Sequence, residues 1–266
     1  MKKILPFIIS ALALTACKKG SVSGTVIDPF TGKAVELPTV WIRGTTFNSQ
    51  KIPGGLPDGK FKFEKIEPGT YTLEAGKSKF SRGSAEFTIT KEDLDAVQDI
   101  YIYNQEVTVG LYRPIPGMEA EKITNDWALW RPECRGSVFA LRARFTTDGL
   151  NPTTRKRERR EMVLPAPKDV PVNIVALYKM SSSILSPIEV ISYPIKNEIA
   201  RNHPECSGVD ARETLLFPDL DKGLKLESAY KSDNLFEIKG TLPSGRQLVA
   251  LNQDGKLVNL YYLNAQ

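Results

Sequence analysis

The residue whose chemistry is easiest to assign is Cys17, one of only three cysteines in the chain. It follows an uncharged apolar segment, residues 4–14, which Lys2 and Lys3 precede. A helix of that length rises about 17 Å, well short of the ~30 Å hydrocarbon core of a bilayer. The basic start, the short apolar middle and the small residues Thr15 and Ala16 instead predict a secretory signal peptide over residues 1–16.

The stretch around this cysteine, Leu14-Thr15-Ala16-Cys17, resembles the lipobox of bacterial lipoproteins. In that family the cysteine thiol carries diacylglycerol, the chain is cut just before it, and the new amino group is often acylated with a fatty acid such as palmitate. The resemblance implies that Cys17 is a lipidation site and the first residue of the mature protein. Several acyl chains make the attachment lasting, because one chain alone binds a membrane only marginally.

The residues that follow indicate which membrane holds this anchor. Lys18 and Lys19 stand where enterobacterial lipoproteins of the inner membrane carry an aspartate, so the resemblance implies the outer membrane and a periplasmic orientation. Strand-like residues begin near Ser21, so residues 17–20 form the lipidated cysteine and a tether that reaches about 10 Å. We therefore expect the first folded module to lie close to the lipid surface.

The other two cysteines, Cys134 and Cys206, occupy similar settings, "RPECRG" and "HPECSG". An exported protein folds in an oxidising compartment, so a disulfide between them is the first interpretation. The alternative is a metal site built on the two thiols, for which the only histidine, His203, is the one further soft ligand. This scarcity of ligands favours the disulfide, and we expect no metal.

Common catalytic motifs are missing from the sequence. It contains no H-E-x-x-H, no G-x-S-x-G and no P-loop. Residues 228–234, "SAYKSDN", combine Ser-x-x-Lys with Ser-Asp-Asn, but in penicillin-binding proteins these motifs come from separate parts of a helical domain. We expect no enzyme activity and no cofactor. A pair of carboxylates far apart in sequence leaves one alternative open, a hydrolase site in the C-terminal half.

Two tryptophans suggest a second alternative, carbohydrate binding. Trp127 and Trp130 precede Arg131 in "NDWALWRPEC", and such rings could stack on sugars or form an interface patch. They could equally pack around the expected disulfide at Cys134.

A basic run provides the last candidate binding surface. It could be a solvated hairpin tip, or it could contact phosphate-bearing lipid or lipopolysaccharide. The basic residues, which surround Glu158, are Arg155, Lys156, Arg157, Arg159 and Arg160.

The overall charge balance argues against nucleic acid as a partner. The chain carries 36 basic and 31 acidic residues, a formal charge of +5. Removing Lys2 and Lys3 with the signal peptide lowers this charge to +3. Such a weak excess does not provide the phosphate contacts on which binding to nucleic acid depends.

Residues 21–104 alternate apolar and polar residues in short runs, with turn residues between them at intervals of about ten. This pattern predicts an antiparallel β-sandwich with alternate apolar residues inside. The inward residues expected in the clearest runs are Val40, Ile42, Phe61, Phe63, Ile66, Tyr71, Leu73 and Ala75. Asp58-Gly59 predicts a hairpin turn and residues 67–70, "EPGT", predict a type II turn with glycine third.

The same stretch resembles the carboxypeptidase regulatory-like domain, a transthyretin-like sandwich. The resemblance rests on "GTVIDPFTGKAVELPTVWIRGT" and "DGKFKFEKIEPGTYTLEAG". Members of this family mostly serve as structural or interaction modules, and the related hydroxyisourate hydrolases use histidines that residues 21–104 lack. Residues 47–57, "FNSQKIPGGLP", form a longer connection than the family minimum, which could be a contact loop or a variable surface loop.

Residues 105–266 contain further strand-like runs without a long helical pattern, and they resemble no family that we identify. The clearest are "EVTVGLY", "SVFALRARF", "VNIVALYK", "PIEVISYPI", "RETLLF", "LFEIKGTL", "RQLVALN" and "LVNLYYL". We expect a second β domain here, a sandwich or a barrel, and an all-β protein as a whole.

Together these features predict a lipid-anchored envelope protein that binds or assembles with another envelope protein through strand edges or loops. Carbohydrate binding and carboxylate-pair hydrolysis remain the alternatives.

Overall fold

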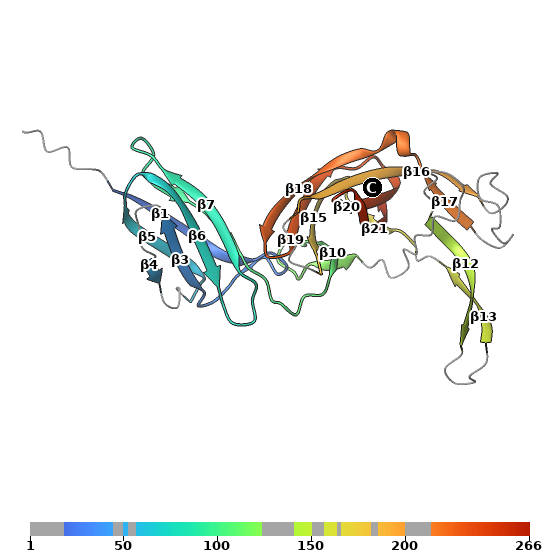
Figure 1. Cartoon of the computed structure of the whole chain (residues 1–266), viewed down its shortest axis with the longest axis horizontal. Coiled ribbons are helices and arrows are strands. Elements are labelled where there is room, and N and C mark those ends of the chain that lie inside the picture. Colours follow the sequence, from blue (N-terminus) through green and yellow to red (C-terminus); the bar gives the residue numbers. More distant parts are fainter. Residues whose placement is uncertain are drawn as a thin grey trace, which may run out of the picture. The chain divides into compact units, whose positions relative to one another are not determined.

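The computed structural model describes residues 19–44, 50–52, 57–123, 141–150, 157–163, 166–181, 186–199 and 214–266 (Figure 1). These residues form an all-β protein, and the only helix among them is the single 3-10 turn η1 (Leu220–Lys222). Within the same residues, no helix has the length and apolar character needed to cross a membrane. The expected signal peptide lies outside the described residues.

The chain divides into two compact units that interleave in sequence. Unit 1 comprises residues up to 27, 34–77 and 84–100. Unit 2 comprises residues 28–33, 78–83 and 101–266. Two short segments from the first part of the chain therefore belong to the second unit.

Two antiparallel sheets carry most of unit 1, and their strands are coloured blue to cyan in Figure 1. The first has the order β2 (Lys33–Ala34), β1 (Gly20–Asp28), β5 (Lys60–Ile66), with β8 (Asp95–Val97) and β9 (Ile100–Tyr101) also paired to β1. The second has the order β4 (Gln50–Ile52), β3 (Thr39–Gly44), β6 (Gly69–Gly76), β7 (Gly83–Ile89). The pair β1–β8 in the first sheet is parallel.

The alternation predicted for unit 1 is confirmed. All eight predicted inward residues are buried, from 0% exposure for Val40 and Leu73 to 3% for Phe61, Phe63, Ile66 and Tyr71. Because successive strand residues point to opposite faces, this burial on both sheets gives the sandwich its apolar interior.

The two turn predictions for unit 1 are only partly confirmed. Gly59 has the expected positive φ of 73°, and the Asp58 carboxylate accepts a hydrogen bond from the Lys60 amide at 3.2 Å. The turn does not close a hairpin, however, because the flanking strands β4 and β5 belong to different sheets. The type II turn at residues 67–70 is wrong, because Gly69 is not among the positive-φ glycines. The Glu67 carbonyl, which would close that turn, instead accepts a hydrogen bond from the Tyr71 hydroxyl at 2.8 Å.

One twelve-stranded sheet builds unit 2, and it branches at the long strand β16 (Ile188–Ile199). One side runs β11 (Glu121–Ile123), β10 (Gly110–Arg113), β15 (Asn173–Lys179), β19 (Leu235–Thr241), β18 (Leu224–Ser232), β16. From β16 the path continues to β17 (Thr214–Pro218), β12 (Leu141–Leu150) and β13 (Arg157–Val163). The other branch runs from β16 through β20 (Gly245–Gln253) and β21 (Lys256–Ala265) to β14 (Lys168–Val170).

The core of unit 2 requires this sheet to curl. The terminal strands β11 and β14 lie at opposite ends of a path through β16, yet Ile123 and Val170 belong to the same buried apolar cluster. Tyr178 and Tyr261 pack edge to face at the centre of this cluster, 6.4 Å apart. The sheet therefore wraps around its own core and brings β11 and β14, two of its three terminal strands, near each other.

Most strand-like runs predicted beyond residue 105 correspond to strands, but four strands, β11, β13, β14 and β18, were not predicted. β18 includes residues 228–232 of the "SAYKSDN" segment, and β13 includes part of the basic run. The first run, "EVTVGLY", forms only the four-residue β10.

Unit 2 also takes part of its core from the β1–β2 connection. Phe30 is 4% exposed and packs edge to face on Tyr103 and Tyr112, at centroid distances of 5.6 and 4.9 Å. The connection is shaped by Asp28, whose carbonyl accepts the Gly32 amide at 2.8 Å and whose carboxylate accepts the Phe30 amide at 2.9 Å.

Candidate functional site

Most site residues predicted from sequence lie outside the described residues. These are Cys17, Cys134, Cys206, Trp127, Trp130, His203, Arg155 and Lys156. The remaining basic residues, Arg157, Arg159 and Arg160, lie in β13, opposite Leu150, Asp148 and Thr147 of β12. The predicted sites therefore remain predictions, and only the strand that carries Arg157, Arg159 and Arg160 belongs to the described structure.

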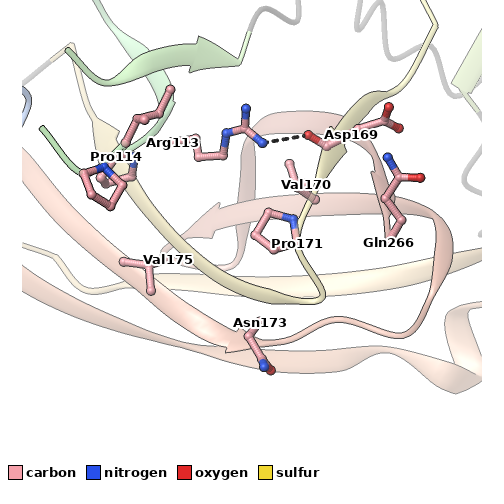
Figure 2. A pocket seen from close by; sticks show the side chains of 10 residues that line it. Arg113, Pro114, Asp169, Val170, Pro171, Asn173, Val175 and Gln266 are labelled. Carbon is pink, nitrogen blue, oxygen red and sulfur yellow. Dashed lines mark hydrogen bonds between the residues drawn. The ribbon is translucent and has the colours of Figure 1, made fainter. Parts of the chain in front are cut away.

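A solvent-open cavity of about 540 Å³ marks a different place in unit 2. We call it the edge hollow, because it lies beside an open stretch of β15, and Figure 2 shows its walls. Its volume falls within the range of about 300–1,000 Å³ that is usual for ligand pockets. The residues lining it are Arg113, Pro114, Ile115, Pro116, Asp169, Val170, Pro171, Asn173, Val175 and Gln266.

The sequence explains why β10 ends at this place. The strand stops at Arg113, and Pro114 and Pro116 follow directly. Proline has no amide hydrogen, so it cannot donate to the ladder of a neighbouring strand. The chain therefore leaves β15 after three paired residues and forms one wall of the edge hollow.

β15 continues past the end of β10 and is left open on that side. Its ladder with β10 covers only Leu177, Tyr178 and Lys179, whereas its ladder with β19 covers all seven residues from Asn173 to Lys179. In the described part of the chain, residues 173–176 consequently have a strand partner on one side only. Val175, at the middle of this stretch, is 45% exposed.

The charges at the rim are matched to one another. The Arg113 guanidinium lies 2.6 Å from one carboxylate oxygen of Glu121, and the Lys168 ammonium contacts the other. Arg113 also donates to the Asp169 carbonyl at 3.2 Å, as the dashed line in Figure 2 shows. The Asp169 carboxylate in turn accepts a hydrogen bond from the Asn264 amide at 2.8 Å.

These pairings set the ionisation of the rim. The hydrogen bond from Lys168, and then that from Arg113, lower the pKa of Glu121 below its usual value, although partial burial opposes them. Glu121 is therefore ionised at neutral pH and holds β10, β11 and β14 together at the rim. Both cations of the rim, Arg113 and Lys168, are thus engaged by the same carboxylate.

The residues lining the edge hollow are mostly apolar. Prolines, valines and an isoleucine make up the apolar walls, and the polar members are Arg113, Asp169, Asn173 and Gln266. Asp169 is the one carboxylate residue among these lining residues, so they do not supply the pair of carboxylates that the hydrolase alternative requires. The chemistry available at the edge hollow is recognition through backbone groups and apolar contact.

Two other clusters prove to be structural. Ser228 of the "SAYKSDN" segment donates to the Ile188 carbonyl at 2.5 Å, and Lys231 pairs with Glu237 at 3.1 Å, so both serve strand packing. Asp28 has a raised pKa chiefly because it is buried, with Glu119 as a lesser cause, but its carboxylate caps the turn at Phe30.

Sequence reasoning missed the edge hollow, although one signal was present. Residues 113–117, "RPIPG", place prolines at alternate positions directly after a strand-like run. Alternate prolines remove the donors that face one neighbour, so they mark the end of a ladder. Which strand would lose its partner there could not be inferred, because β15 lies more than fifty residues further along the chain.

Comparisons with known proteins give no family. No protein-family profile and no curated protein matches the chain. Among solved structures, it is similar to a DUF3823 family protein from Bacteroides ovatus, with 14% identity, 94% of this chain and 97% of that chain covered, and a TM-score of 0.25. It is also similar to a provisionally assigned carbohydrate-binding protein from Bacteroides uniformis, with 9% identity, coverages of 92% and 96%, and a TM-score of 0.26.

A third similarity is to the major pilin SpaD from Corynebacterium diphtheriae, with 10% identity and a TM-score of 0.29, covering 93% of this chain and 66% of that chain. TM-scores this low do not establish a shared fold, so these proteins support no conclusion about function. The all-β architecture rests on the strands of this chain itself.

Proposed function

We propose that this chain is a lipid-anchored protein of the bacterial outer membrane that acts as a non-enzymatic protein-binding or assembly module, with the open edge of β15 as its contact site. One observation carries the proposal. Residues 173–176 of β15 have a strand partner on one side only within the described structure, and an apolar hollow lies beside them.

An open strand edge is a natural protein-binding element. Its free amide and carbonyl groups can pair with a strand from another chain, and a neighbouring apolar cavity can accept a side chain of that strand. Carbohydrate binding is supported less at this place, because none of the residues lining the edge hollow is aromatic.

The membrane part of the proposal rests on the sequence. Cys17 in its lipobox-like context would carry the acyl chains, and the short tether would hold the folded units at the periplasmic face of the membrane. An anchored protein meets its partners by diffusion in two dimensions, which suits a module that works through a small contact.

The test is photo-cross-linking in intact cells that express the full chain. A photoreactive amino acid is placed at Val175, or at Val258 of β21 as a matched control, since the two valines are 45% and 46% exposed. We expect a discrete protein adduct from position 175 alone. The same adducts from both positions, or none from position 175, would contradict the binding role.

A Cys17→Ala arm of this experiment tests the anchor. We expect the variant to leave the membrane fraction and to lose incorporation of labelled palmitate. If it stays in the membrane fraction and keeps the label, the lipid-anchor part of the proposal is wrong, whatever the cross-linking shows.

A further inference from the structure

We infer that the segment received by the edge hollow is an extended, uncharged peptide strand that hydrogen-bonds to the backbone of Asn173 and Val175 and places an apolar side chain opposite Ile174. This inference rests on the proposed function, because it specifies the partner chemistry of the same site. The hydrogen-bonding direction of β15, the charge balance of the rim and the end of β10 each support it.

The direction of the free groups on β15 follows from its known hydrogen bonds. The Val172 carbonyl accepts the Leu242 amide at 2.7 Å, and the Met180 amide donates to the Asn234 carbonyl at 2.8 Å, so both groups point toward β19 and its flanking residues. In an antiparallel strand, successive residues direct their backbone groups to opposite sides. Even-numbered residues of β15 therefore face β19, and odd-numbered residues face the other side.

A side-chain contact agrees with this assignment. Asn173 and Thr241 lie directly opposite each other and join their side chains at 2.9 Å, as expected for a pair without mutual backbone hydrogen bonds. On the other side, β10 lies opposite Leu177, Tyr178 and Lys179 only. The amides and carbonyls of Asn173 and Val175 consequently point to the open edge, next to the hollow.

These two residues define the length and the backbone geometry of the occupant. Residues two apart in a strand are separated by about 7 Å, so the shortest occupant is a three-residue extended segment. Its outer two residues would pair with Val175 and Asn173. Its middle residue would lie opposite Ile174 and point its side chain to the same face of the sheet.

The surroundings of that middle position select an apolar side chain. Ile174 and Val170 belong to the same core cluster, and Val170 also lines the edge hollow. Valine and isoleucine suit both this apolar wall and an extended backbone. A charged side chain would lose its hydration there without gaining a new partner.

The two cations of the rim are already paired. Arg113 and Lys168 share the Glu121 carboxylate, so an acidic peptide would have to break one of these ion pairs. The Asp169 carboxylate accepts a hydrogen bond from the Asn264 amide and is exposed, so a cation there would remain hydrated and gain little. The paired cations and the apolar surroundings of Ile174 therefore favour an uncharged segment.

The probe for a test is the capped peptide acetyl-Thr-Thr-Val-Thr-Thr-amide, carrying a fluorophore, titrated into the purified full-length protein and followed by fluorescence anisotropy. We expect saturable binding. Replacing the central valine with aspartate or lysine should weaken binding about tenfold or more. Equal affinity for the three peptides would overturn the inference.

Backbone methylation of the peptide tests the pairing itself. An N-methyl group removes one amide donor, and a paired strand uses the donors of alternate residues on each side. We expect affinity to fall at alternate positions of the peptide only. Loss at every position, or at none, would exclude strand pairing and overturn the inference.

Two variants test the protein side. Val175→Pro removes a donor that faces the open edge and leaves the ladder with β19 intact, whereas Val175→Thr keeps the donor. We expect at least a tenfold loss for the proline variant and less than a threefold change for threonine. Should the proline variant fail to fold, Ile115→Asp replaces it. Ile115 lines the edge hollow but lies outside the strands, and we expect its replacement by aspartate to weaken peptide binding at least tenfold as well.

The outcomes separate this inference from the proposed function. If position 175 gives an adduct in cells but the purified protein does not discriminate among the peptides, the proposed protein contact at this edge is supported and the strand-pairing inference is overturned. Selective peptide binding without an adduct would support the peptide chemistry and contradict the proposed role in the cell.

Discussion

At the scale of single residues, two effects oppose each other at Asp28: burial disfavours its charged carboxylate, but the turn uses that carboxylate as a hydrogen-bond acceptor. Its side chain is 8% exposed, and burial raises the pKa of its carboxyl above the usual 3.8. The same carboxylate accepts the Phe30 amide and so fixes the turn that delivers Phe30 to the core of unit 2. The turn needs an acceptor at this position, but it does not need a charge.

We therefore predict that Asp28→Asn leaves stability at neutral pH unchanged or raises it, whereas Asp28→Ala lowers the free energy of unfolding by about 1–2 kcal/mol. A folded-state pKa above the unfolded one means that the charged form opposes folding, so wild-type stability falls as pH rises through this pKa. Urea unfolding of the three proteins at neutral and acidic pH checks this. A destabilised asparagine variant would show that the charge itself is needed.

The pKa shift of Glu121, and with it the expected pH dependence of stability, is opposite to that of Asp28. Lys168 and Arg113 lower its pKa below the usual 4.5, so its pairing stabilises the folded protein above that value and is lost as pH falls through the lowered pKa. Because the three side chains are 30–43% exposed, we discount the pairing to about 0.5–1 kcal/mol.

Glu121→Gln should therefore unfold at lower urea concentration than wild type at about pH 7, and the difference should vanish once the pH falls below the lowered pKa of Glu121. Lys225→Gln, which breaks the more exposed pair with Glu189 on β16, is the matched control and should have little effect. A difference for Glu121→Gln that persists in acid would mean that its role is packing and not charge.

At the scale of elements, the length of β10 decides whether β15 has an open edge. Pro114 and Pro116 end the ladder, and Val175 then lacks a strand partner on that side within the described structure. We predict that replacing both prolines with valine and threonine lets β10 continue alongside β15. The amides of Asn173 and Val175 should then exchange with solvent about tenfold or more slowly, since ladder hydrogen bonds protect amides.

Hydrogen exchange read by NMR measures this change residue by residue. The amides of Ile174 and Ala176, which face β19, serve as internal controls and should not change. Unaltered exchange at residues 173 and 175 would show that something other than the prolines keeps β10 short.

At the scale of the whole molecule, the core of unit 2 depends on residues far ahead of it in sequence. Residues 28–33 and 78–83 belong to unit 2, and Phe30 packs against Tyr103 and Tyr112 within it. Phe30→Ala should therefore destabilise unit 2 by about 3–5 kcal/mol through the lost ring and the cavity left behind, and Phe30→Leu by clearly less.

Chemical denaturation followed by amide exchange of β10 and β15 measures the loss where it is expected. A change below about 1 kcal/mol for Phe30→Ala would mean that unit 2 does not need this ring. The same interleaving predicts that a chain starting at residue 105 folds less stably than the full chain.

The sequence by itself determined the all-β class, the strand faces of unit 1 and most strands of unit 2. Period-two alternation and turn glycines are local signals, so burial of Val40 or Leu73 and the positive φ of Gly59 could be predicted. The type II turn at residues 67–70 failed because the Tyr71 hydroxyl competes for the Glu67 carbonyl, a contact that turn propensities do not include.

Only the tertiary structure decided where the open edge lies and what surrounds it. The edge hollow joins residues 113–116, 169–175 and 266, which meet because the sheet curls and brings β11 and β14 near each other. Strand order and sheet curvature depend on pairings between residues far apart in the chain, and hydrophobic periodicity carries no information about them. The prolines could be read from the sequence, but the strand whose partner they remove could not.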